Sequence, residues 1–237
     1  MPAIASMHPR FVSVFLRADA ETFYEWVLQR QSQLIAFCVI AIAAGAGLYG
    51  AAMGSWSCPL QALYSGIKLP LVILLTTAGN GLLNGMLAPL LGLNASFRQS
   101  LLVVLMTFAV ACLILGALSP VALFLVWNTP PLTAGTQETS PEYGFLQLTL
   151  AIFVACAGIV GNMRLLPVLS RWTSNQGVAR RVLLAWLAGN LFLGSQICWV
   201  LRPFIWEPHG PTRFIGQEYL HGSFYETVFE VVRRLVF

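Results

Sequence analysis

Charged residues are scarce in this chain of 237 residues: Asp, Glu, Lys and Arg make up 9% of it, against about 25% in soluble domains. Hydrophobic residues make up 57%, and the mean hydropathy is +0.75. These values exclude an ordinary soluble domain and predict a protein that crosses a membrane several times. No short apolar run precedes a small-residue cleavage site in the first thirty residues, so we expect no cleavable signal peptide.

Carboxylate and histidine side chains are missing from the apolar stretches. No Asp or Glu lies within them, and the three histidines, His8, His209 and His221, lie outside them. An intramembrane enzyme, a haem protein or a proton relay needs such groups at depth. Sequence motifs of hydrolases, zinc proteases and nucleotide-binding proteins are also absent. We therefore expect no enzyme, no cofactor and no metal; a metal site of His209, His221 and Glu218 is the weaker alternative.

Cysteine pairs and basic clusters are lacking as well. None of the five cysteines is spaced as C-x-x-C, and only Cys58 falls between apolar stretches, which argues against a disulfide framework or a zinc site. The net charge of +4 arises from scattered arginines and the single lysine, Lys68. Because no basic face interleaved with aromatic residues exists, we expect no nucleic-acid partner.

Apolar stretches long enough to cross a bilayer recur along the chain, at about 34–53, 68–92, 101–127, 143–169 and 182–201. They predict an all-α, polytopic transmembrane helical bundle of about five spans. Residues 1–31 form an N-terminal cytoplasmic or interfacial segment with an amphipathic helix. Residues 32–206 form the transmembrane domain, and residues 207–237 form an extramembrane tail that ends in an amphipathic helix.

The second span carries polar residues where lipid does not tolerate them unpaired. Thr76, Asn80 and Asn84 recur every four residues and so share one face of a helix, beside the G-x-x-x-G pair Gly81 and Gly85. An unpartnered amide in hydrocarbon costs about 2–7 kcal/mol. This stripe must therefore face other helices or a small wet cavity.

Polar residues in other spans must likewise face either other helices or a wet cavity. Asn190 and Gln196 of the fifth span also need partners, and we favour hydrogen bonding between helices over a pathway for solutes. Lys68, at the outset of the second span, is expected to extend to the headgroups, with binding of an anion as the alternative.

Arginine asymmetry predicts the orientation. The second-to-third and fourth-to-fifth connections, with the adjoining span ends, hold Arg98, Arg164, Arg171, Arg180 and Arg181, whereas the other two connections hold Lys68 alone. Basic residues accumulate on cytoplasmic loops. We expect a bacterial inner-membrane protein with its N-terminus in the cytoplasm and its C-terminal tail outside.

The end of the tail has the pattern of an amphipathic helix. Ser223 and Glu226 form a capping-box pair. One apolar face follows at helical spacing: Phe224, Val228, Val231, Val232 and Leu235. Such a face needs a cover, which is the chain's own bundle, the lipid interface or another subunit. Because the helix has few basic residues, we favour another subunit over anionic lipid.

About fifty residues from the second to the third span share one pattern: an apolar span, then Leu91, Gly92, Ser96, Phe97, Arg98 and Gln99, then a further apolar span. In this pattern the region resembles the Yip family of small five-span membrane proteins with a cytoplasmic N-terminus. Eukaryotic members act in membrane traffic with small GTPases and carry an acidic N-terminal motif, which this sequence lacks. The resemblance therefore implies a topology rather than an activity.

Together these patterns predict a non-catalytic accessory or scaffolding subunit of a membrane protein assembly. Its expected partners are the lipid bilayer and other membrane protein subunits or further copies of itself. The alternative is a small permease or channel subunit that uses the polar stripe of the second span.

Overall fold

The computed structural model describes residues 12, 15–17, 19–92, 95–130, 141–163, 165–173, 175–202, 213–216 and 222–226. The elements of this part are α2 (Ala20–Gln29), α3 (Gln31–Gly54), α4 (Pro59–Leu90), α5 (Phe97–Asn128), α6 (Pro141–Asn162), α7 (Leu165–Leu169) and α8 (Gln176–Leu201). Within it, five helical stretches are long and apolar enough to cross a membrane: α3, α4, α5, α8 and the stretch Gly144–Leu169. The predicted all-α bundle of five spans is confirmed.

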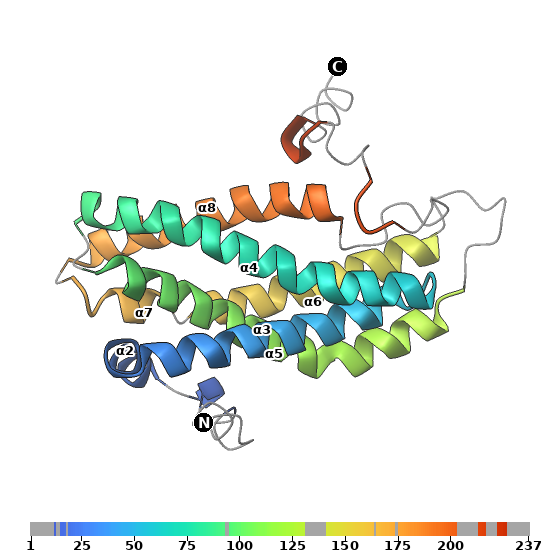
Figure 1. Ribbon diagram of the computed structural model, residues 1–237, viewed down its shortest axis with the longest axis horizontal. Helices are drawn as coiled ribbons and strands as arrows, with labels where there is room; N and C mark the ends of the chain where they lie inside the picture. Colours follow the sequence, from blue (N-terminus) through green and yellow to red (C-terminus); the bar gives the residue numbers. More distant parts are fainter. Residues whose placement is uncertain are drawn as a thin grey trace.

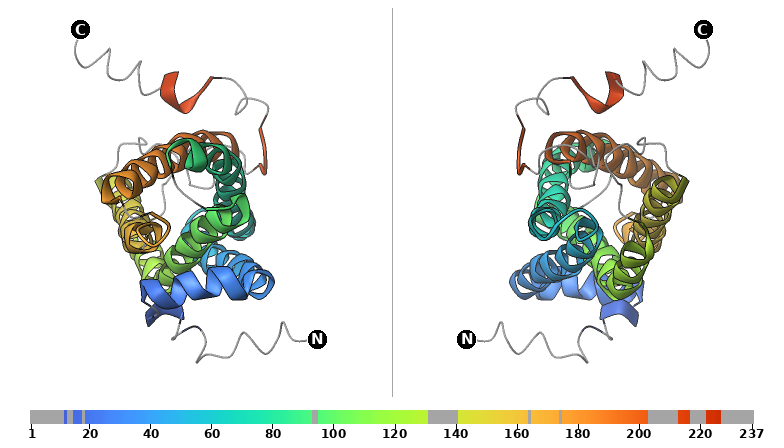
Figure 2. Two further views of the ribbon diagram at one scale, coloured as in Figure 1. Left: turned by 90° about the vertical axis from the view of Figure 1, so that its left-hand side faces the viewer. Right: turned by 90° about the vertical axis from the view of Figure 1, so that its right-hand side faces the viewer.

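The long helices lie side by side along one axis (Figure 1), and α2 runs across their ends (Figure 2). α3, α4 and α5 pack on one another in all three pairings, while α6 packs on α5 and α8 packs mainly on α4. We call the two ends of the bundle the α2 end and the tail end. The tail end is where α8 stops and residues 213–216 lie (Figure 1).

Glycines allow the three central helices to approach closely. Gly45 of α3 lies against the backbone of Cys112 in α5. A Cβ atom on Gly54 would lie 2.6 Å from the carbonyl oxygen of Gln61 in α4, and one on Gly161 of α6 would lie 2.6 Å from that of Thr107 in α5. Small residues at such positions bring helix backbones together in membranes, where packing replaces the hydrophobic effect between helices.

The second span begins at Pro59, nine residues before the predicted start at Lys68. Pro59 occupies the first helical position, where its missing N–H is no loss, and the Sγ atom of Cys58 accepts the N–H of Gln61 at 3.4 Å. Pro70 lies inside α4, and Pro120 lies inside α5, which continues to Asn128. Hydropathy alone missed the first turns of α4 because they mix apolar residues with Gln61, Tyr64 and Ser65.

The segment that carries the Yip-like pattern starts a helix. The Ser96 hydroxyl accepts the N–H of Gln99 at 3.3 Å, and the Gln99 side chain accepts the N–H of Ser96 at 2.8 Å. This reciprocal capping box satisfies two N–H groups at the start of α5. Ser96 and Gln99 therefore have a structural reason to stand three residues apart that is independent of any activity.

The fourth span is interrupted near its end, where one helix over 143–169 was predicted. α6 ends at Asn162, and the short α7 begins at Leu165. Pro167 provides the reason, because it has no N–H to donate to the carbonyl of Met163 and its ring would clash with that carbonyl in a continuous helix. α7 then leads into the turn before α8.

The N-terminal helix α2 lies at the surface of the α2 end. The Asp19 carboxylate accepts the N–H of Thr22 at 2.9 Å, and this bond holds the pKa of Asp19 below its usual value. Aromatic contacts connect α2 to its neighbours. Phe15, before α2, bridges α2 and α3, because its ring lies 5.3 Å from that of Phe23 in α2 and 4.9 Å from that of Phe37 in α3. The rings of Tyr24 in α2 and Trp172 in the α7–α8 turn lie 5.5 Å apart.

The start of the tail helix lies on α8. The capping box is formed, with the Ser223 N–H bonded to the Glu226 carboxylate at 2.9 Å and the Glu226 N–H bonded to the Ser223 hydroxyl at 3.2 Å. Tyr225 stacks on Phe192 of α8 at 5.1 Å, and its hydroxyl lies 2.5 Å from that of Ser195. Of the predicted docking face, Phe224 is half-buried and contacts Tyr225, whereas Val228, Val231, Val232 and Leu235 lie outside the described residues.

Candidate functional site

The polar stripe of α4 meets a matching stripe on the antiparallel α8. The contacts pair Thr76 with Gly194 and Asn80 with Asn190, so each step of four residues along α4 matches four residues back along α8. Continuing that register places Trp186 at the level of Asn84. We call these residues the α4–α8 seam: Thr76, Asn80, Asn84, Trp186, Asn190 and Gly194. Figure 1 shows the two helices side by side.

Asn80 joins the two helices at the middle of the seam. Its Nδ2 atom donates to the Oδ1 atom of Asn190 at 2.5 Å and to the backbone carbonyl of Trp186 at 3.2 Å. Gly189 of α8 lies directly against the Asn80 side chain, where a Cβ atom would not fit. Hydrogen bonds of this kind between membrane helices contribute about 0.6–2 kcal/mol each. Asn80 therefore helps to attach α8 to the bundle.

Asn84 makes no such bond. Its side chain is fully buried, and neither its Oδ1 nor its Nδ2 atom has a partner among the described residues. The Nε1 atom of the fully buried Trp186 and the Oδ1 atom of Asn80 are likewise without a partner there. Buried polar atoms of this kind are normally satisfied by protein or by ordered water. The Asn84 end of the seam thus has uncharged donors and acceptors available to a water molecule or a small polar solute.

The remaining predicted residues take no part in the hydrogen bonds that join α4 and α8 in the described part of the chain. Thr76 bonds to its own helix through the carbonyl of Val72 at 2.7 Å. Gly81 and Gly85 face α5, where the side chains of Leu101 and Phe97 rest on them, so this pair receives side chains rather than another backbone. The Oε1 atom of Gln196, further along α8 than Asn190, is buried and has no partner in the described part.

Sequence reasoning missed Trp186. The signal was present, because Trp186, Asn190 and Gly194 repeat every four residues as Thr76, Asn80 and Asn84 do. A tryptophan in an apolar stretch looks like an ordinary lipid-facing or core residue. Only the antiparallel register reveals that Trp186 lies at the level of Asn84.

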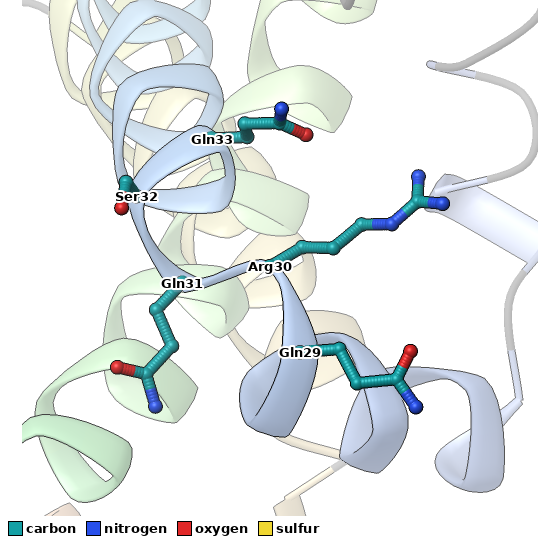
Figure 3. A pocket seen from close by; sticks show the side chains of 5 residues that line it. All are labelled: Gln29, Arg30, Gln31, Ser32 and Gln33. Atoms are coloured by element: carbon teal, nitrogen blue, oxygen red, sulfur yellow. The ribbon is translucent and has the colours of Figure 1, made fainter.

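A surface notch of about 450 Å³ lies at the corner between α2 and α3. It is lined by consecutive residues, Gln29, Arg30, Gln31, Ser32 and Gln33. Figure 3 shows that these side chains point in different directions rather than toward a common point. The Gln31 amide is already bonded to the carbonyl of Val27 at 2.9 Å. The notch therefore lacks the convergent groups of a catalytic or binding site.

Metal ligands do not gather in the described part of the chain, where no group of three or more His, Cys, Asp and Glu residues could hold an ion. The predicted alternative of His209, His221 and Glu218 lies outside that part. Arg164, one of the residues used for the orientation, also lies outside it.

Lys68 differs from its prediction. Its side chain is 2% exposed, and its Nζ atom donates to the backbone carbonyl of Arg213 at 3.2 Å. The ammonium also lies 5.4 Å from the ring centroid of Phe214. Lys68 therefore does not extend freely to the headgroups, because residues of the tail cover it.

The helices and the seam define a multi-pass α-helical membrane protein with an uncharged polar contact between two of its spans. No family model, no curated protein and no solved structure matches the chain. The resemblance to the Yip family stays a prediction, and the functional argument must start from the chain's own residues.

Proposed function

We propose that this chain is a non-catalytic subunit of a membrane protein assembly, with an accessory or scaffolding role. The observation that carries the proposal is the position of α8. This helix of 26 residues packs mainly on α4, and only 11% of its most apolar stretch is buried within the chain. A span held along one side offers its other side to lipid or to a further helix.

The outer side of α8 has the shape of a helix contact. Ala188 is exposed between larger residues, Leu184 and Leu191, which are 66% and 74% exposed. A small residue flanked by larger ones forms a shallow groove into which a neighbouring helix can pack. We propose that a helix of another subunit, or of a second copy of this chain, occupies that groove.

We further propose a bacterial inner membrane with the α2 end in the cytoplasm. Arg98, Arg171, Arg180 and Arg181 lie at or near that end of their helices, which supports this orientation under the positive-inside rule. With five spans, the tail end then lies outside. Reporter fusions after Ser170 and after Phe237 test it: the first should report the cytoplasm and the second the outside, and a cytoplasmic Phe237 contradicts the orientation.

A matched pair of variants tests the assembly role. Ala188→Trp fills the groove on α8, whereas Ala44→Trp makes the same change at an exposed position of α3. After gentle extraction from native membranes, we expect Ala188→Trp to lose its companion chains and Ala44→Trp to keep them. If both variants keep their companion chains equally, or if the wild-type chain purifies without companions, the proposal is contradicted.

The amide of Asn84, which has no partner among the described residues, supports a second candidate, a small permease or channel subunit for an uncharged solute. Asn84→Leu would close such a path by removing its polar atoms. Flux of water and glycerol into proteoliposomes measures this directly, with Leu83→Ala, an exposed neighbour, as the control. Loss of flux in Asn84→Leu with an intact assembly favours the permease, and the absence of any flux in the wild type excludes it for these solutes.

A further inference from the structure

Lys68 is a buried cation whose charge the described residues do not balance. It forms no ion pair with any of them, and the salt bridge found there, Arg171 with Glu21, lies at the opposite end of the bundle. An ammonium has three N–H donors, and the Arg213 carbonyl accepts one of them. Because burying a charge is costly without a partner of opposite sign, this position calls for an anion.

Two arginines, Arg202 and Arg213, also lie at the tail end of the bundle near Lys68. The register of the α4–α8 seam, continued toward the tail end, brings Arg202 to the level of Lys68, since each lies eight residues beyond the contact of Thr76 with Gly194. Arg202 ends α8 in a left-handed conformation with a φ of 42°, and its guanidinium stacks on the ring of Trp199 at 4.8 Å. Arg213 is the residue whose carbonyl contacts the ammonium, and it is exposed.

Aromatic residues fix this arrangement. Phe214 lies over the Lys68 ammonium, and its ring meets that of Tyr64 edge to face, with the centroids 5.3 Å apart. Tyr64 lies one turn before Lys68 on α4, so the same tail residue contacts both. Segment 213–216 is thereby held against the bundle beside α8, where Figure 1 shows it.

We propose that Lys68, Arg202 and Arg213 form a binding site for a phosphate group at the tail end of the bundle. A phosphate oxygen would take the ammonium donors that the Arg213 carbonyl leaves unused, and guanidinium groups match the remaining oxygens. Lys68 lies nine residues, or about 13 Å of helix, inside the start of the 32-residue α4. That depth is near the boundary between headgroups and hydrocarbon for a bilayer core of about 30 Å.

The phosphate has two possible sources, an anionic phospholipid headgroup or a soluble phosphate. Native mass spectrometry of the purified full-length chain distinguishes them in separate titrations with phosphatidylglycerol, phosphatidylcholine and inorganic phosphate. Tighter binding of phosphatidylglycerol than of phosphatidylcholine, without competition by inorganic phosphate, identifies the lipid. Competition by inorganic phosphate identifies a soluble ligand. If neither phosphatidylglycerol nor inorganic phosphate binds more tightly than phosphatidylcholine, the proposal is overturned.

Variants locate the site. Lys68→Met keeps the length of the side chain but removes its charge, and we expect binding about fivefold weaker, as for one basic residue at a membrane surface. Lys68→Arg should keep the affinity, and so should Arg98→Gln, the control at the α2 end. Unchanged binding by Lys68→Met overturns the proposal and leaves Lys68 as an anchor for the tail. If Lys68→Met does not fold, Arg202→Gln replaces it with the same expected loss.

This inference is independent of the assembly role, because its site lies at the tail end of α4 and its measurements need no partner chain. Failure of the lipid titration therefore leaves the role of α8 untouched, and loss of companions from Ala188→Trp leaves the phosphate site untouched.

Discussion

α5 and α8 are both long, apolar helices, yet they are buried within the chain to very different extents. Of the most apolar stretch of each, 61% is buried within the chain for α5 and 11% for α8. α5 lies between α3, α4 and α6, whereas α8 packs mainly on α4. The difference shows that hydropathy identifies a span but does not determine its neighbours. The neighbours of a span depend on where glycines allow another helix to approach closely and on where amide side chains can form hydrogen bonds.

The largest expected effect on stability concerns the contact between α3 and α5 in the centre of the bundle. Gly45→Val places a branched side chain against the backbone of Cys112, which cannot move without separating α3 from α5. Overpacking costs about 1–3 kcal/mol and more when backbone must shift, so we expect loss of folded protein in a detergent-resistance assay. Gly158→Val on α6, where nothing lies within 4 Å of the added Cβ, should fold normally. Equal behaviour of the two variants contradicts the central packing.

The seam should show an asymmetry between its two asparagines. Asn80→Leu removes the bonds to Asn190 and Trp186 and should destabilise the attachment of α8 by about 0.6–2 kcal/mol. Asn84→Leu removes an amide that has no partner among the described residues, so its effect should be smaller. Reversible unfolding in detergent mixtures measures both. A larger loss for Asn84→Leu would mean that bound water or a solute holds the seam together.

The contact between the tail and α8 should be weaker still. Tyr225→Phe keeps the stacking on Phe192 but removes the hydroxyl that lies next to Ser195 and donates to the Phe192 carbonyl at 3.1 Å. We expect a loss of about 0.5–1.5 kcal/mol, seen as faster labelling of a cysteine placed at Ser223. Phe224→Leu, which leaves this hydroxyl in place, is the control, and equal labelling of all three proteins argues against the contact.

The smallest expected effect is the dependence of α2 on pH. The hydrogen bond from Thr22 lowers the pKa of Asp19, so its contribution to α2 is present above the ordinary carboxyl pKa and is lost as the pH falls through the lowered value. Hydrogen exchange of the Thr22 amide should therefore become less protected in acid. Asn also caps helices, so Asp19→Asn should keep the protection and remove the pH dependence. Exchange in the wild type that is flat across this range contradicts the cap.

Much of the fold followed from patterns that depend on one segment at a time. The five spans followed from apolar length, and the capping pair Ser223 and Glu226 followed from local spacing. Hydropathy does not predict the start of α4 at Pro59 or the break before Pro167, because proline can either begin a helix or interrupt one while the surrounding residues stay apolar.

The site was less predictable because it depends on which helices meet. The sequence indicates that Asn80 and Asn84 need partners, but it does not reveal that Asn80 bonds to Asn190 whereas Asn84 has no partner among the described residues. The burial of Lys68 depends on a tail segment 145 residues away along the chain. Such contacts between distant segments have no periodic signal in the sequence.

The most direct test asks what lies against the outer side of α8. A photo-crosslinking residue at Leu191 of α8 can be compared with one at Leu48 of α3, since both positions are exposed, at 74% and 59%. In native membranes we predict that Leu191 crosslinks to a second polypeptide, or to another copy of this chain, while Leu48 crosslinks to lipid. If both positions crosslink to lipid alone and the chain migrates at its own mass of 25.9 kDa, the account of α8 as an assembly surface is contradicted.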